Sequence, residues 1–105
     1  MTHASMVASW LAIGLVAACG ARPAPMGVTA ADAVVYVKSN VRDALVYVDG
    51  RFIAPLEALR GGVALEPGTH RLELRHEDYY SSYLELQLAR AERKNVAMDM
   101  ATILP

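Results

Sequence analysis

Residues 44–53 decide the fold, and their sequence is ALVYVDGRFI. Two runs containing Val, Tyr, Phe and Ile, which favour β-strands, are separated here only by Asp49-Gly50. Both of these residues tolerate a positive φ, so the dipeptide favours a type I′ turn, whose twist matches that of paired strands. The stretch therefore predicts a tight β-hairpin with strands at 44–48 and 51–53.

Segments with strand character continue on both sides of this hairpin. They are rich in β-branched residues or alternate apolar with polar residues, and they comprise residues 33–38, 63–65, 71–75, 84–88 and 95–100. In the last segment Val96, Met98 and Met100 share one face. Gly61-Gly62 and Pro67-Gly68 predict turns between strands, the second of them of type II.

The spacing of these segments predicts the fold class. Ala54-Pro55-Leu56 is expected to end the third strand, because proline has no amide donor for the ladder. Residues 56–60 could form one helical turn, and no longer helix fits. About six or seven short strands predict an all-β domain, a small antiparallel β-sandwich over residues 33–101, since a single sheet would leave one apolar face in water. Residues 102–105 would form a C-terminal tail.

The first 18 residues differ in composition from the rest of the chain. They contain no Asp, Glu, Lys or Arg, and residues 7–18 (VASWLAIGLVAA) are mostly apolar. This run is shorter than the ~20 residues that a membrane-spanning helix needs. Its length and position are typical of the apolar region of a signal peptide, which would cover residues 1–18.

The segment Leu15-Val16-Ala17-Ala18-Cys19-Gly20 resembles the lipobox of bacterial lipoproteins. The resemblance implies that the signal peptidase recognises Val16, Ala17 and Ala18, that it cleaves before Cys19, and that the Cys19 thiol carries a diacylglyceryl group. Two or three acyl chains would hold the protein stably on its membrane, at about 0.8 kcal/mol per buried methylene. Alternatively, Cys19 ends an ordinary secretory signal or is a buried apolar residue.

The residues after the cysteine predict a tether and a location. Residues 20–32 (GARPAPMGVTAAD) have no apolar periodicity and contain two prolines and two glycines, so residues 19–32 are expected to form a flexible tether. The implied location is the cell envelope, with a lipid anchor. Gly20 stands where Asp would resemble an inner-membrane retention signal, which favours the outer membrane.

A second resemblance rests on the folded segment. Its residues are Ala44-x-Val46-x-Val48-Asp49-Gly50, Ala54-Pro55, Leu65-x-Pro67-Gly68-x-His70 and Tyr79, and their order and spacing resemble those of a PEGA domain over roughly Val34 to Met100. The tetrapeptide that names the family falls on residues 41–44 and keeps only its alanine. The resemblance implies a small β-sandwich of bacterial envelope and surface proteins, without a known catalytic centre, in which Tyr79 is a core residue.

Charge and residue spacing exclude several classes of function. The ten Lys and Arg and eleven Asp and Glu residues are interspersed and give a net charge of −1, which argues against a nucleic-acid binder. His70 and His76 would lie about 20 Å apart on one strand, too far to share a metal ion. Ser81 and Ser82 have no nucleophile motif around them. We therefore expect no catalytic residue, no metal and no cofactor.

The tyrosines near the middle of the domain offer the one candidate binding surface. Tyr79, Tyr80 and Tyr83 flank Ser81 and Ser82, and exposed tyrosines can stack on sugar rings or anchor a protein partner. A structural role for these side chains is the competing interpretation. Tyr80 and Tyr83 are the expected partner-binding residues, and replacing both with alanine should leave stability nearly unchanged.

Together these features predict a membrane-anchored envelope lipoprotein with a non-catalytic binding or scaffolding domain. Its expected partners are the membrane, through acylated Cys19, and an envelope protein or a peptidoglycan-type glycan. The alternative is a structural subunit that joins a larger envelope assembly through an open sheet edge.

Overall fold

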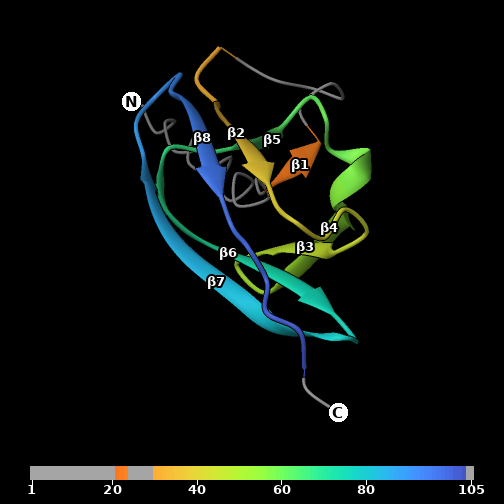
Figure 1. The fold of residues 1–105 in the computed structure, drawn as a ribbon. Helices are drawn as coiled ribbons and strands as arrows, with labels where there is room; N and C mark the ends of the chain where they lie inside the picture. The colour runs from red at the N-terminus through yellow and green to blue at the C-terminus, as the bar shows by residue number, and fades with distance from the viewer. Residues whose placement is uncertain (1–20, 24–29, 104–105) are drawn as a thin grey trace, which may run out of the picture.

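Two four-stranded sheets face each other in the computed structural model, which describes residues 21–23 and 30–103 (Figure 1). The first sheet has the order β1-β5-β2-β8 and the second β4-β3-β6-β7. Their strands are β1 (Arg22–Pro23), β2 (Ala33–Lys38), β3 (Leu45–Val48), β4 (Arg51–Pro55), β5 (Val63–Leu65), β6 (Gly68–His76), β7 (Tyr79–Leu88) and β8 (Arg93–Ala97). The predicted all-β sandwich is confirmed, and its eight described strands include the short β1, which the sequence did not indicate.

The predicted hairpin forms the β3–β4 pair. Asp49 and Gly50 have φ values of 52° and 84°, as a type I′ turn requires. β4 continues to Pro55, which pairs with Leu45, so the prediction that proline ends this strand before residue 54 is wrong. The reason is that β4 lies at the edge of the second sheet as described, next to β3, and an edge tolerates a residue without an amide donor.

Strand pairing is antiparallel except between β2 and β8. These two strands run parallel, with Val34 opposite Arg93 and Lys38 opposite Ala97. The chain leaves the second sheet at the end of β7 and returns beside β2 after a short turn at residues 89–92 (Figure 1). A short three-residue helix, η3 (Leu56–Ala58), lies between β4 and β5, where one helical turn was expected.

The core lies between the sheets and takes large side chains from both. Those with almost no exposed surface are Val35, Val46, Val48, Val63, Leu65, Leu72 and Leu74. Met98 and Met100 are buried as expected, although β8 ends at Ala97 instead of Met100. The side chain of Asn40 takes the place of a strand there, because it accepts a hydrogen bond from Met100 N–H at 2.9 Å and donates one to Met100 C=O at 3.0 Å.

The N-terminal strand attaches part of the expected tether to the domain. Arg22 and Pro23 of β1 pair with Ala64 and Val63 of β5. The Arg22 guanidinium also forms an ion pair with the buried carboxylate of Asp32. Both ends of the segment 21–32 therefore contact the first sheet, while residues 24–29 lie outside the described part of the chain.

Candidate functional site: an aromatic face on the second sheet

The outer face of the second sheet carries a row of large side chains. Register places Phe52 of β4 beside Tyr47 of β3, Tyr47 beside Glu73 of β6, and Glu73 beside Tyr83 of β7. On β3 and β6 their neighbours in the sequence, Val46, Val48, Leu72 and Leu74, point inward to the core, because successive residues of a strand face opposite sides. We call this surface, made of Tyr47, Phe52, Arg71, Glu73, Arg75 and Tyr83, the aromatic face.

Arginine side chains order the aromatic rings. The Arg75 guanidinium lies 3.9 Å from the centroid of the Tyr47 ring, and Tyr47 meets Phe52 edge to face with centroids 5.6 Å apart. Arg71 stacks in the same way on Tyr83, at 4.5 Å. Cation–π contacts of this kind contribute about 0.5–1 kcal/mol at exposed sites. These contacts restrict the rings before any ligand binds, so binding would cost little additional side-chain entropy.

Glu73 links the two arginine–tyrosine pairs. Its carboxylate accepts hydrogen bonds from Arg75 at 2.6 and 3.2 Å, and only 8% of the residue is exposed. The hydrogen bond from Arg75 lowers the pKa of Glu73, and the Arg75 charge and Tyr83 act in the same direction against the opposing effect of burial. The same carboxylate raises the pKa of Arg75. Both groups are therefore charged near neutral pH, and the ion pair between them holds the centre of the aromatic face in place.

Tyr80 and Tyr83 are both exposed, at 59% and 53% of their surface. Strict alternation would put residues three apart on opposite faces, but a register shift changes this. β6 advances two residues, from Leu74 to His76, while β7 spans three, from Ser82 to Tyr79. The extra residue lets Tyr80 reach solvent as Tyr83 does, while Tyr79 packs against the main core, where the family resemblance placed it.

In the described part of the chain, His70 and His76 both lie against carboxylates. His70 Nδ1 lies 2.7 Å from Asp49, and His76 Nε2 lies 3.1 Å from Asp43, so an Asp–His pair stands at each end of the β3–β6 ladder. Among the described residues, no three His, Cys, Asp or Glu side chains gather as a metal site would require. Ser82 faces Leu74 in the ladder, and neither histidine has a serine among its ring partners.

The predicted lipidation site cannot be placed. Cys19 and the peptidase residues Val16, Ala17 and Ala18 lie outside the described residues. Within residues 21–23 and 30–103, no helix is both long and apolar enough to cross a membrane.

Sequence reasoning named Tyr80 and Tyr83, which are exposed, as candidate partner-binding residues and did not name Phe52, Arg71 or Arg75. The alternation of Arg71, Glu73 and Arg75 with leucines did indicate that these charges share one face. This alternation does not indicate the strand register, which places the two arginines over tyrosines of neighbouring strands. No protein-family model matches this chain, and a search of curated proteins finds no match.

Proposed function

We propose that the protein is an envelope lipoprotein, anchored through acylated Cys19, whose PEGA-like domain is a non-catalytic binding or scaffolding module. Its partner is an envelope protein or a cell-wall glycan. The anchor rests on the lipobox-like segment that ends at Cys19. The binding role rests on the aromatic face together with Tyr80, an exposed residue of the same strand as Tyr83.

The observation that carries the binding role is the exposure of three aromatic side chains on one sheet. Phe52, Tyr80 and Tyr83 each expose more than half of their surface, at 52%, 59% and 53%. Exposed large aromatics mark interaction sites more often than scattered small apolar residues do. Tyrosine also offers a wide apolar ring and a polar hydroxyl, which suits both sugar rings and protein surfaces.

The position of β1 supports a domain held close to its membrane. Arg22 is paired with β5, and only two residues separate it from Cys19. Three extended residues span about 10 Å at most. An acylated Cys19 would therefore bring the β1 edge of the first sheet near the lipid surface, with the second sheet on the opposite side of the core.

Binding is tested with full-length protein extracted from membranes in detergent. We expect it to sediment with isolated peptidoglycan sacculi or to crosslink to an envelope protein in cells. Tyr80→Ala with Tyr83→Ala should abolish this capture while changing the free energy of unfolding by no more than about 1 kcal/mol, since exposed substitutions cost little. The matched control is Gln87→Ala with Arg90→Ala, two exposed positions away from the tyrosines. Full capture by the tyrosine variant would contradict the role of these residues.

The alternative function, a structural subunit, is favoured by the edge of β7. This ten-residue strand is the last of the second sheet, so one of its sides has no neighbouring strand among the described residues. On that side it contacts residues 101–103, through a Tyr79–Thr102 bridge and a 2.8 Å hydrogen bond from Tyr80 N–H to Ala101 C=O. Most of the strand can therefore pair with another chain. Concentration-dependent association of the purified protein in analytical ultracentrifugation would support this alternative.

A further inference from the structure

Among the described residues, no strand pairs with the second half of β2 on the side of β5, and we call this place the vacant position. β5 is only three residues long and pairs with Ala33, Val34 and Val35. Gly62, which directly precedes β5, has a φ of +92°, and the chain before it does not pair with β2. The second half of β2, residues 36–38, thus has β8 on one side and no described strand on the other.

Hydrogen-bond geometry shows which backbone groups face this position. On the β8 side, Val34 N–H donates to Glu92 C=O at 2.8 Å, and Lys38 C=O accepts from Met98 N–H at 2.8 Å. Because a strand directs the amide groups of alternate residues to opposite neighbours, the N–H and C=O of Val37 point to the side that β5 has left. A strand added there would find one donor and one acceptor ready to pair.

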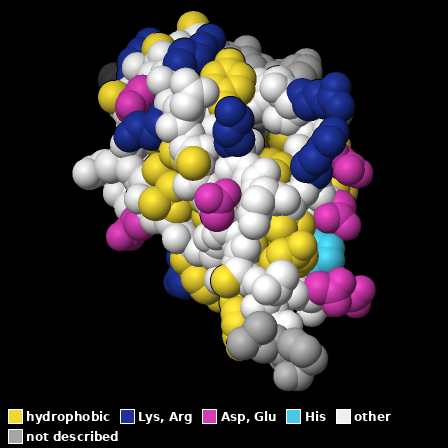
Figure 2. All heavy atoms as spheres, in the orientation of Figure 1, with side chains coloured by type: hydrophobic (Ala, Val, Ile, Leu, Met, Phe, Trp, Pro, Cys, Tyr) yellow, Lys and Arg dark blue, Asp and Glu magenta, His cyan; other side chains and the backbone are white. Residues whose placement is uncertain are grey.

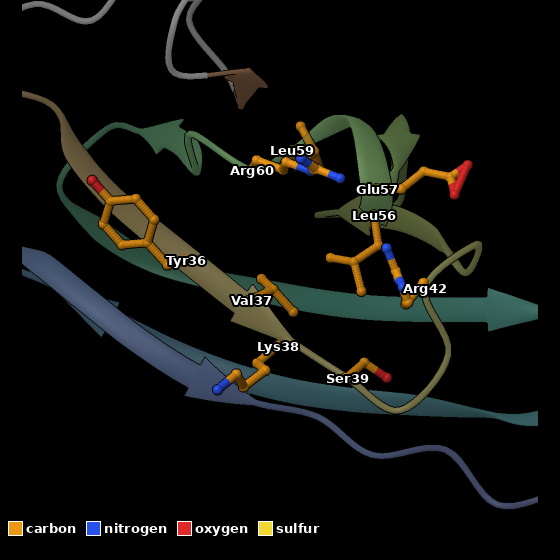
Figure 3. Close-up of a pocket in the computed structure, with 9 residues that line it drawn as sticks. All are labelled: Tyr36, Val37, Lys38, Ser39, Arg42, Leu56, Glu57, Leu59 and Arg60. Carbon is orange, nitrogen blue, oxygen red and sulfur yellow. The ribbon is translucent and has the colours of Figure 1, made fainter.

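A cavity of about 210 Å³ occupies this position (Figure 3). Figure 3 shows β2, with Tyr36, Val37 and Lys38, along one side, and Leu56 and Arg60 from the segment around η3 on the other. The far wall is fixed by the backbone, since Leu56 N–H donates to Ala44 C=O at 2.8 Å and Glu57 N–H to Arg42 C=O at 3.1 Å. The buried side chains of Leu56 and Leu59 give it an apolar part.

The rim of the cavity is basic. Lys38, Arg42 and Arg60 are exposed lining residues, and Glu57 is the one carboxylate among them. None of the three cations takes part in an ion pair within the described part of the chain. In Figure 2, Lys and Arg side chains are spread over the upper half of the face, both where β2 and η3 lie in Figure 1 and near the start of β8. Three cations against one carboxylate favour an anionic ligand.

We propose that this vacant position receives an extended acidic segment of a partner protein, which adds a strand to β2. The main chain of the segment pairs with Val37, its carboxylates meet Lys38, Arg42 and Arg60, and an apolar residue between them contacts Leu56 and Leu59. A peptide fits better than a glycan, because the N–H and C=O of Val37 that face this position are the groups through which neighbouring strands pair. The inference goes beyond the proposed binding function, because it names a partner chemistry for a site separate from the aromatic face.

The test uses fluorescein-labelled capped pentapeptides and full-length protein in a non-ionic detergent. One peptide alternates glutamate with valine and the other alternates lysine with valine. We expect the acidic peptide to raise fluorescence polarisation and to shift the Val37 amide resonance in NMR spectra, and the basic peptide to do neither. Lys38→Glu with Arg60→Glu should weaken acidic-peptide binding at least about tenfold, which is 1.4 kcal/mol.

Two controls make the outcome specific. Arg51→Glu with Arg90→Glu changes the net charge equally at exposed positions outside the cavity lining and should leave binding unchanged. Tyr80→Ala with Tyr83→Ala should also leave peptide binding unchanged, so failure of the aromatic face and failure of this site are distinguishable. Equal weakening in the Arg51/Arg90 variant or absence of acidic-peptide binding would overturn the proposal. Anionic lipid vesicles are tested in parallel, and binding to the vesicles alone would overturn it as well.

Discussion

At the residue scale, the ends of the β3–β6 ladder depend on single polar side chains. Asp49 accepts a 2.9 Å hydrogen bond from Arg71 N–H and faces His70 Nδ1, while His70 Nε2 lies 2.7 Å from Glu66 C=O. Both partners of the His70 ring are acceptors, so the ring donates both bonds at once only when it carries two protons. One carboxylate thus joins the hairpin turn to the start of β6.

The charge of Asp49 should make stability depend on acid pH. Partial burial raises the pKa of Asp49, but the bonds from Arg71 and His70 outweigh it, so this pKa lies below its ordinary value of 3.8. A lowered pKa means that the carboxylate stabilises the fold above that value and that this stabilisation is lost as the pH falls through the folded-state pKa. We expect Asp49→Asn, which still tolerates the positive φ, to reduce the fall in melting temperature between pH 5 and pH 2.

The remaining pH dependence should come from Glu73 and Glu92, whose pKa values are also lowered. Asp99→Asn is the control, because Asp99 is exposed and lies outside β3 and β6. An Asp49→Asn protein with the full acid sensitivity of the wild type would show that this ladder end does not depend on the charge.

Gly50 and Gly62 both have a positive φ, but only Gly62 is closely packed, so substitutions at the two positions distinguish the cost of backbone strain from that of steric overlap. Gly50 and Gly62 have φ values of 84° and 92°, but a Cβ at Gly50 would meet nothing, whereas one at Gly62 would lie 2.6 Å from Val34 Cγ1. We expect Gly50→Ala to cost about 1–2 kcal/mol of unfolding free energy from strain alone. Gly62→Ala should cost at least about 1 kcal/mol more, because the buried Val34 must also move. Equal losses in urea denaturation would contradict this packing.

At the element scale, local signals were predictable and distant pairings were not. Asp49-Gly50 specifies its hairpin within a few residues, and the leucine alternation specifies which faces of β6 and β7 are buried. The parallel β2–β8 pairing joins segments about 60 residues apart, since Val34 lies opposite Arg93, and β1 has only two residues, so neither leaves a local pattern.

For the candidate site as well, local features were predictable from the sequence and features that depend on distant strand pairing were not. The exposure of Tyr80 and Tyr83 agrees with the expectation from sequence, although the register shift in β7 that produces it has no sequence signal. The arginines over Tyr47 and Tyr83 depend on the pairing of three strands. The vacant position beside β2 depends on where β5 begins, which Gly61-Gly62 indicated only as a turn.

At the scale of the whole molecule, the two sheets have different surroundings in the proposed arrangement. The first sheet holds β1, close in sequence to Cys19, and also holds the vacant position at β2. The second carries the aromatic face on its outer side. A lipid anchor beside one sheet would leave the other turned toward partners farther from the membrane. This arrangement depends on acylation of Cys19.

The most direct test is the intact mass of the protein extracted from membranes, for the wild type and for Cys19→Ser. We predict a wild-type mass that begins at Cys19 and includes the added acyl groups, and the absence of this species in the variant. An unlipidated wild-type mass recovered in the soluble fraction would contradict the anchor and the envelope function built on it.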